Sequence, residues 1–179
     1  MDTNKLKFTQ LENEIFSLLC LRSGEKLSQR EMAKILDVSP TAIAKSLKKL
    51  LNNEFAVLEK TKTINFISLN IKNKRVIEIK RSENIKNIYL SGLSDYLEES
   101  LAGSTIILFG SYSKGEDTNR SDIDIAVIER KQKSMDIEKY EKRLNRKIII
   151  NFYDSWKEIH KNLKNNILNG IVLHGGVDL

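Results

Sequence analysis

The first third of the chain follows a helical pattern of hydrophobic and polar residues. From Phe8, apolar residues recur at the spacing of an amphipathic helix that ends near the stretch RSGEK. The stretch LSQREMAKILDVS predicts a second, short helix, because Ser28 and Glu31 have the spacing of a capping box. Ser39 and Pro40 then begin a third helix, PTAIAKSLKKLLNN, since proline is favoured at the first helical position. The pattern therefore predicts three helices separated by tight turns.

The third helix separates its side chains by chemistry. An apolar stripe is expected to face the core and consists of Ile43, Leu47, Leu50 and Leu51. The opposite face is small, polar and basic, and carries Thr41, Ala42, Lys45, Lys48 and Lys49. A lysine-rich helix face is often only a solvated surface, so this pattern alone identifies no ligand.

A β-hairpin is predicted after the third helix. The stretch FAVLEKTKTINFISLN alternates apolar and polar residues on either side of EKTK, which places Lys60 and Lys62 at a basic tip. Three helices followed by a hairpin resemble the winged helix-turn-helix family of DNA-binding domains, and we place this domain at residues 1–71. The resemblance implies that the third helix enters the major groove while the hairpin approaches the adjacent backbone.

The resemblance also divides the basic residues between two kinds of contact with double-stranded DNA. It implies that Thr41, Ala42 and Lys45 lie nearest the base edges. It implies phosphate contacts for the four lysines, which are Lys48, Lys49, Lys60 and Lys62. A hairpin that docks a protein or forms a dimer remains an alternative.

A helical connector is predicted at residues 72–89. The segment begins with the basic stretch KNKRVIEIKRSEN and continues into an amphipathic helical pattern that extends to Leu101. Gly92 is the only breaker inside that pattern, and we expect the helix to pack on a C-terminal domain at residues 90–179.

The C-terminal domain contains two apolar stretches that predict strands. The first ends in small residues, and the second has two aspartates near its start. TIILFGS predicts a buried strand that ends at Gly110 and Ser111, where a phosphate could approach free backbone N–H groups. In the next predicted strand, SDIDIAVI, the two-residue period sends Ile123 to one face and both Asp122 and Asp124 to the other.

Two carboxylates on one strand face repel each other unless a cation lies between them. Mg²⁺ would use Asp122 and Asp124 as ligands and keep positions for water and phosphate oxygens. The alternative is a solvated strand end with two surface aspartates.

The stretch GSYSKGEDTNRSDIDIAV closely resembles the signature of minimal nucleotidyltransferases of the DNA polymerase beta superfamily. The resemblance implies a small mixed sheet with flanking helices, so that the whole chain is α+β. It implies Mg²⁺ on the catalytic pair Asp122 and Asp124, and an NTP held by Gly110 and Ser111 with Lys114 as a neighbour of the triphosphate. It also implies a small helical partner protein, since such transferases occur in toxin–antitoxin pairs.

One position departs from this family pattern. A third carboxylate on a later strand normally completes the site, but the matching stretch NRKIIINFYD has Ile149 and Asn151 near that position. Asp154 lies just past the strand and could substitute only if the chain turned it back. Two functions therefore remain open: a nucleotidyltransferase that acts on a protein or nucleic acid, and a DNA-binding regulator or antitoxin-like protein whose nucleotidyltransferase domain is weak or inactive.

Composition sets broader limits. A net charge of +6 and a pI of about 9.3 permit a nucleic-acid partner without establishing one. No run of about 18 apolar residues occurs, so we expect a cytoplasmic protein with no membrane contact. Cys20 has no second cysteine with which to pair. No segment indicates a dimer interface, and a homodimer stays open because winged helices often dimerise.

Overall fold

The computed structural model describes residues 7–177 and divides the chain into two compact units, Met1–Val76 and Ile77–Leu179. Each unit has its own sheet, with three strands in the N-terminal unit and four in the C-terminal unit. The expected α+β fold class is therefore confirmed. Within the described residues, every helix is too short or too polar to cross a membrane. The domain limits expected at residues 71 and 90 stay predictions.

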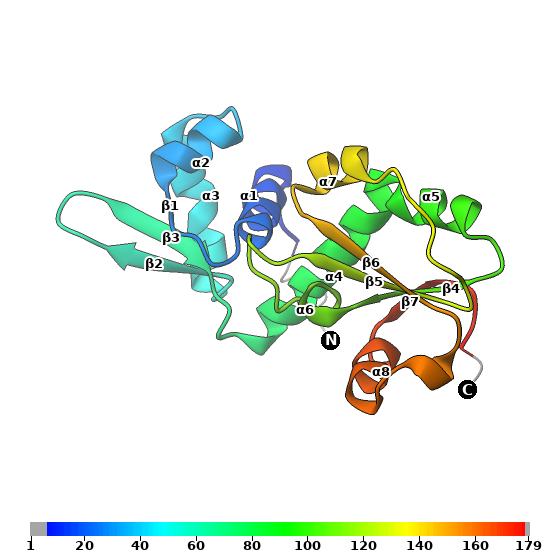
Figure 1. The fold of residues 1–179 in the computed structure, drawn as a ribbon. Helices are drawn as coiled ribbons and strands as arrows, with labels where there is room; N and C mark the ends of the chain where they lie inside the picture. The colour runs from blue at the N-terminus through cyan, green and yellow to red at the C-terminus, as the bar shows by residue number, and fades with distance from the viewer. Residues whose placement is uncertain (1–6, 178–179) are drawn as a thin grey trace. The chain divides into compact units, whose positions relative to one another are not determined.

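The N-terminal unit has the element order of a winged helix (Figure 1). Its elements are α1 (Gln10–Leu21), β1 (Leu27–Ser28), α2 (Gln29–Ile35), α3 (Pro40–Asn52), β2 (Ala56–Lys60) and β3 (Asn65–Leu69). Strand β3 is central and pairs antiparallel with both β1 and β2. The predicted three helices and hairpin are all present.

Local capping explains where these helices begin. Ser28 and Glu31 form the predicted capping box at the start of α2. The Ser39 hydroxyl accepts a hydrogen bond from the Ala42 N–H at the start of α3, with Pro40 in the first turn as predicted. A third cap, formed by Thr9 and Glu12 at the start of α1, was not predicted from the sequence.

The helices of the N-terminal unit bury the predicted apolar stripe of α3. Ile43, Leu47 and Leu50 are almost fully buried, whereas Leu51, the fourth residue of the predicted stripe, is only half-buried. Phe55, which follows α3, packs edge-on against Phe16 of α1 with ring centroids 5.4 Å apart. Cys20 is also buried.

The C-terminal unit is a mixed sheet with helices on both faces. Its elements are α4 (Lys74–Ser91, which begins in the N-terminal unit), α5 (Leu93–Ser100), β4 (Thr105–Phe109), α6 (Gly110–Lys114), β5 (Ile123–Ile128), α7 (Glu138–Leu144), β6 (Ile148–Tyr153), the 3-10 helix η2 (Trp156–Glu158), α8 (Lys161–Leu168) and β7 (Ile171–His174). The strand order is β6-β5-β4-β7. Strand β5 is antiparallel to β4 and parallel to β6, whereas β7 is antiparallel to β4.

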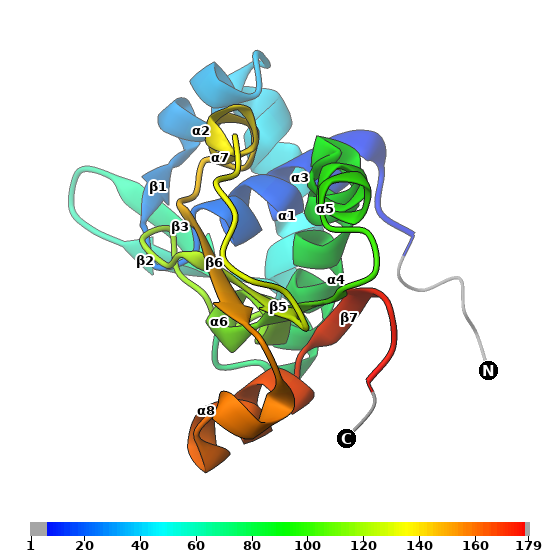
Figure 2. The same cartoon turned by 45° about the vertical axis from the view of Figure 1, so that its right-hand side comes forward.

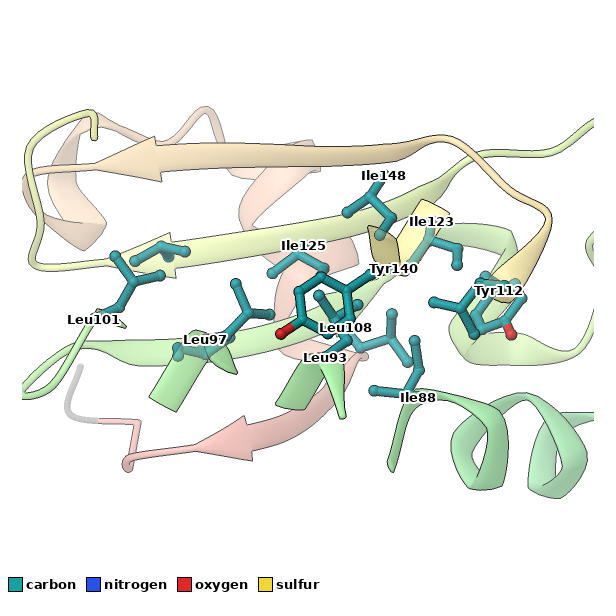
Figure 3. Packing of buried hydrophobic residues seen from close by; sticks show 13 residues of the cluster. Ile88, Leu93, Leu97, Leu101, Leu108, Tyr112, Ile123, Ile125, Tyr140 and Ile148 are labelled. Carbon is teal, nitrogen blue, oxygen red and sulfur yellow. The ribbon is translucent and has the colours of Figure 1, made fainter. Parts of the chain in front are cut away.

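The two faces of this sheet have separate hydrophobic cores. Figure 3 shows the larger core, in which Leu97 of α5 and Tyr140 of α7 pack on Ile125 of β5. The other face is covered by η2 and α8, and its core includes Phe109, Ala126 and Trp156. Figure 2 shows α8 on the opposite side of the sheet from α5 and α7. The buried residues of β5 therefore alternate between the two cores.

The helical pattern expected to run through to Leu101 is broken at Gly92. Its φ of 76° lies in the left-handed region, and α4 ends at Ser91 while α5 starts at Leu93. Since glycine adopts this conformation without a Cβ clash, the chain changes direction there. The break allows both Ile88 and Leu97 to reach the same core.

Candidate functional site

Gly110, the first residue of α6, lies next to Asp124 of β5 at the point where β4 ends. Gly110 has a φ of 76°, and a Cβ at this position would lie 2.4 Å from the Oδ2 of Asp124. That distance is far below van der Waals contact. Glycine is therefore required here by the backbone conformation and by the neighbouring carboxylate. The Gly-Ser turn and Asp124 are brought into direct contact, although 14 positions separate them in sequence (124 − 110).

The strand that carries Asp124 alternates as predicted over residues 123–125, but it begins at Ile123, so Asp122 lies outside the strand and not on its face as predicted. Ile123 and Ile125 of β5 are fully buried in the larger core. Asp124 lies between them in sequence and is half-buried, and its pairing partners are Phe109 on β4 and Ile149 on β6. Asp122 precedes the first residue of β5 and is exposed.

The electrostatics of the two carboxylates favour a cation. Burial, and secondarily the charge of Asp122, raise the pKa of Asp124 above its usual value. Neither carboxylate forms an ion pair with any residue in the described range 7–177. Two carboxylates of this kind fit Mg²⁺, which is commonly held by one or two carboxylates together with water and phosphate oxygens.

The neighbouring strand supplies no third acid. Ile149 pairs directly with Asp124, and Asn151 pairs with Ala126, so neither of the two positions near which a third carboxylate is expected carries an acid. Over residues 7–177, there is no group of three His, Cys, Asp or Glu side chains suited to a metal ion. The site is thus limited to one pair of carboxylates.

The remaining predicted nucleotide-binding residues lie on α6. Ser111 is half-buried in the first turn of this short helix. Lys114 is exposed, and its Nζ donates to the Oδ1 of Asn166 on α8 at 3.1 Å. Lys114 therefore links α6 to α8, and its role beside a triphosphate stays a prediction.

Most residues predicted to contact DNA are exposed. Thr41, Lys45 and Lys48 are exposed on α3, and Ala42 is half-buried. Lys60 ends β2 and Lys62 lies in the turn that follows, both with exposed side chains. The tip itself is ordered by hydrogen bonds between Thr61 and Ile64.

Lys49 differs from these residues because it is engaged within its own unit. Its Nζ lies 3.2 Å from the Oε2 of Glu12 and also donates to the carbonyl oxygen of Lys7. The ammonium group lies 5.4 Å from the centre of the Phe8 ring. Lys49 therefore ties α3 to α1, and a phosphate contact would compete with these interactions.

Replacing Glu12 with glutamine is expected to lower the Tm at neutral pH. Burial alone raises the pKa of Glu12, but hydrogen bonds from Thr9 and the Lys49 ammonium lower it below its usual value. A carboxyl whose pKa is lowered on folding contributes stability above its unfolded pKa of about 4.3, and this stability is lost as the pH falls through the folded value. Thermal melts at pH 7 and at about pH 3 measure the difference.

The matched control is Glu14→Gln, since Glu14 lies on the same helix and accepts a hydrogen bond from Gln10 that glutamine can keep. An unchanged Tm for Glu12→Gln at pH 7 would show that the Glu12–Lys49 contact does not stabilise the unit.

A buried polar cluster next to the site was not predicted. Lys80, Asp117 and Arg146 are all almost fully buried, and Asp117 pairs with both cations. In the sequence, Lys80 lies within a basic stretch that is typical of a solvated helix. Only its position facing inward on α4, one turn from Asn84, distinguishes it from the other lysines.

Comparison with known proteins gives a family match within the C-terminal unit. No curated protein matches the sequence. A solved structure of Lactococcus lactis ZitR, as a point mutant, is similar with a TM-score of 0.41 and 18% identity, over 56% of this chain and 66% of that chain. The chain thus covers just under two thirds of that protein, and this limited likeness identifies no function. Residues 92–175, which include Gly110 and both aspartates, match the family model described as Polymerase beta, Nucleotidyltransferase.

Proposed function

We propose that the protein is a Mg²⁺-dependent nucleotidyltransferase whose winged helix binds double-stranded DNA. The observation that carries the proposal is the close approach of Gly110 to Asp124. It places the backbone of Gly110 and Ser111 next to a carboxylate that is influenced by the charge of Asp122. Neither carboxylate has a cationic partner within the described residues 7–177. The family match over the same residues supports it.

Each residue of the site has a distinct role in this proposal. Asp122 and Asp124 hold Mg²⁺, which when bound neutralises charge on the phosphates. The backbone at Gly110 allows the triphosphate to come close, because no Cβ stands in the way. The half-buried Ser111 hydroxyl donates to a phosphate oxygen.

The reaction is an in-line displacement at the α-phosphorus of an NTP. A hydroxyl oxygen of the acceptor forms the new bond to phosphorus, and the bond between the α-phosphorus and the α,β-bridging oxygen breaks. The nucleotidyl group is thereby joined to a protein or nucleic-acid acceptor, pyrophosphate leaves with the bonding electron pair, and the hydroxyl proton passes to water. A small helical partner protein is one acceptor of the proposed class.

A second function is favoured by a specific observation. Ile149, the direct neighbour of Asp124, stands where the family resemblance implies a third carboxylate. A site without that acid lacks a ligand and a base, and it could bind a nucleotide while transferring it poorly. In that case the protein is a DNA-binding regulator or antitoxin-like protein that keeps nucleotide binding as a signal.

The two functions are distinguished by incubating the purified protein with each α-labelled NTP and Mg²⁺, alone and with cell extract. Transfer of label to a protein or RNA supports the nucleotidyltransferase. Binding of NTP that depends on Mg²⁺, without transfer, supports the regulator. Absence of both transfer and binding would refute a nucleotide role for the C-terminal unit.

Removing the two lysines of the hairpin tip is expected to weaken DNA binding without changing sequence preference. The double variant Lys60→Ala and Lys62→Ala removes two exposed cations expected to contact phosphates. Because each phosphate contact contributes about 0.9 to the slope of log K against log salt, the slope should fall by about 1.8. Binding is measured with labelled DNA duplexes at several salt concentrations.

The control for this prediction is Lys131→Ala with Lys157→Ala, which removes two exposed lysines from the C-terminal unit. An equal loss of affinity in both double variants would indicate a net-charge effect and would contradict a specific role for the hairpin tip.

A further inference from the structure

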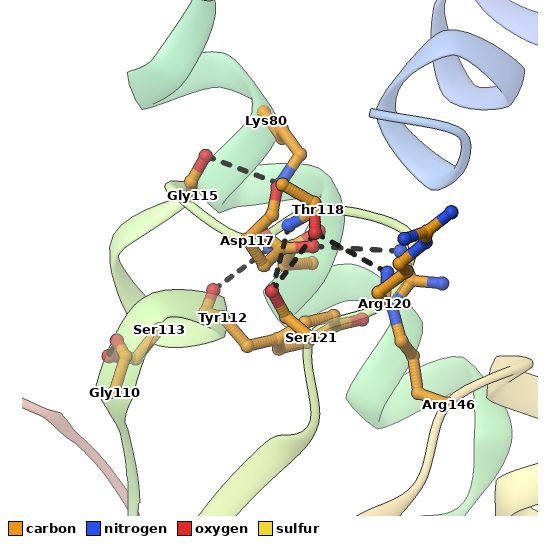
Figure 4. Close-up of polar contacts among 11 residues, drawn as sticks. Lys80, Gly110, Tyr112, Ser113, Gly115, Asp117, Thr118, Arg120, Ser121 and Arg146 are labelled. Carbon is orange, nitrogen blue, oxygen red and sulfur yellow. Dashed lines mark hydrogen bonds and ion pairs between the residues drawn. The ribbon is translucent and has the colours of Figure 1, made fainter. Parts of the chain in front are cut away.

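Four polar side chains meet in the interior beside the Gly-Ser turn. Figure 4 shows Lys80 and Arg146 approaching Asp117, which lies in the loop between α6 and β5. The Nζ of Lys80 forms an ion pair with the Oδ1 of Asp117 and donates to the carbonyl oxygens of Gly115 (3.2 Å) and Asp117 (3.0 Å). Asn84 donates to the same carboxylate oxygen at 2.6 Å, and the Nη2 of Arg146 lies 3.7 Å from the Oδ2.

The burial of these charges is nearly complete. The exposed fraction is 0% for Lys80, 2% for Asp117 and 6% for Arg146. Buried ion pairs usually add little net stability, because the cost of desolvation offsets the attraction between the charges. Replacing such charges with apolar residues of similar volume is often neutral or stabilising. The cluster is better explained by the geometry that it imposes than by the stability that it adds.

The Asp117 side chain connects the loop between α6 and β5 to Lys80 and Asn84 of α4. On one side of it, the Glu116 N–H donates to the Ser111 carbonyl oxygen at 3.0 Å. On the other side, the Thr118 N–H donates to the Ser121 Oγ at 3.0 Å, and the Ser121 N–H donates to the Thr118 carbonyl oxygen at 3.1 Å. The two halves of the loop are therefore closed by their own hydrogen bonds, and Asp117 anchors the middle to α4.

The two carboxylates of the site depend on this loop to different degrees. Asp124 lies within β5 and is positioned by its pairing with Phe109 and Ile149 on two neighbouring strands. Asp122 comes before Ile123, the first residue of β5, and so lies outside the paired strand. Its placement depends on the loop that Asp117 anchors.

We propose that Lys80, Asn84, Asp117 and Arg146 are positioning residues that set Asp122 at the distance from Asp124 and the Gly-Ser turn needed to bind a Mg²⁺–nucleotide complex. None of the four touches the nucleotide. This inference rests on the proposed nucleotide-binding function, which it extends from the carboxylates themselves to the buried residues that support them.

The test is the variant Lys80→Met, which keeps a side chain of similar length and leaves Asp117 paired with Arg146 as one negative and one positive charge. Supporting groups behind metal ligands typically change metal affinity by about 10- to 100-fold when removed. We expect the affinity for a non-hydrolysable NTP analogue with Mg²⁺ to fall by at least about 10-fold. Calorimetric titration measures it.

Hydrogen exchange provides the second readout, independent of nucleotide binding. Exchange in Lys80→Met should become faster at residues 115–121 and stay unchanged in β4 and β5. The matched control is Lys86→Met, which removes an exposed lysine on the same helix that pairs with Glu83. This control should change neither the nucleotide affinity nor the loop exchange.

Each outcome of these measurements decides the proposal. Unchanged affinity and unchanged loop exchange in the folded variant would overturn it. Faster exchange throughout the C-terminal unit would also overturn it, since the cluster would then act only on overall stability. If the unaltered protein binds no nucleotide, the proposed function fails, and exchange confined to residues 115–121 would still establish Asp117 as the loop anchor.

A second variant covers the case in which Lys80→Met does not fold. Asn84→Ala removes the donor to the Asp117 carboxylate and to the Tyr112 carbonyl oxygen without removing a charge. The same pattern of weaker nucleotide binding and faster loop exchange is expected, with a smaller amplitude. Normal binding and normal exchange in Asn84→Ala would overturn the proposal.

Discussion

Replacing both Asp122 and Asp124 with asparagine is expected to abolish nucleotidyl transfer and leave DNA affinity unchanged. Asparagine keeps the size of each side chain but cannot supply the negative charge that holds Mg²⁺. Metal stabilisation of the transition state contributes several kcal/mol, so the rate should fall by about 1000-fold or more. Transfer is measured with α-labelled NTP, and DNA binding is measured on the same preparations by gel shift.

Asp136→Asn is the matched control, because Asp136 is exposed and precedes α7 outside the candidate site. Transfer that persists in the double aspartate variant would contradict the assignment of these residues. A parallel loss of DNA affinity would indicate misfolding, which circular dichroism of the double variant would reveal.

The substitution Gly110→Ala is expected to remove nucleotide binding and to destabilise the C-terminal unit. Two effects add at this position. The left-handed backbone costs an alanine about 1–2 kcal/mol, and the new Cβ would stand 2.4 Å from the Asp124 carboxylate. Relieving that contact must shift the turn or rotate Asp124 away from Asp122. Nucleotide affinity with Mg²⁺ and the urea midpoint of unfolding measure the two effects.

Gly103→Ala separates the backbone cost from the steric one. Gly103 also has a left-handed φ, 84°, but a Cβ there would meet nothing within 4 Å. We expect a similar backbone penalty and normal nucleotide binding. If both alanine variants bind nucleotide equally well, the contact between Gly110 and Asp124 has no part in the site.

The features that the sequence predicts correctly are those with local causes. Capping at Ser28 and Ser39, the hairpin tip at Lys60 and the alternation around Asp124 each depend on residues a few positions apart. Such signals can be detected within a short window of the sequence. The resemblance places the family's third carboxylate near Ile149, but that Ile149 pairs with Asp124 is known only from the structure.

The features that the sequence does not reveal depend on contacts between distant segments. Lys80 and Asp117 are 37 residues apart, and Glu12 and Lys49 are also 37 apart. A lysine in a basic stretch looks the same whether it faces water or a buried carboxylate. Only the packed structure separates Lys49 and Lys80, which pair within their own units, from the exposed lysines of α3 and the hairpin.

The aromatic residues offer a spectroscopic consequence. Trp156, buried among Phe109, Ala126 and Ile167 on one face of the larger sheet, is the only tryptophan in the chain. All five tyrosines also follow residue 77, so the N-terminal unit contains neither chromophore. Fluorescence excited near 295 nm and near-ultraviolet dichroism above about 290 nm should therefore report only on the C-terminal unit, whereas far-ultraviolet dichroism reports on both. A difference between the two denaturation curves would measure how independently the N-terminal and C-terminal units unfold.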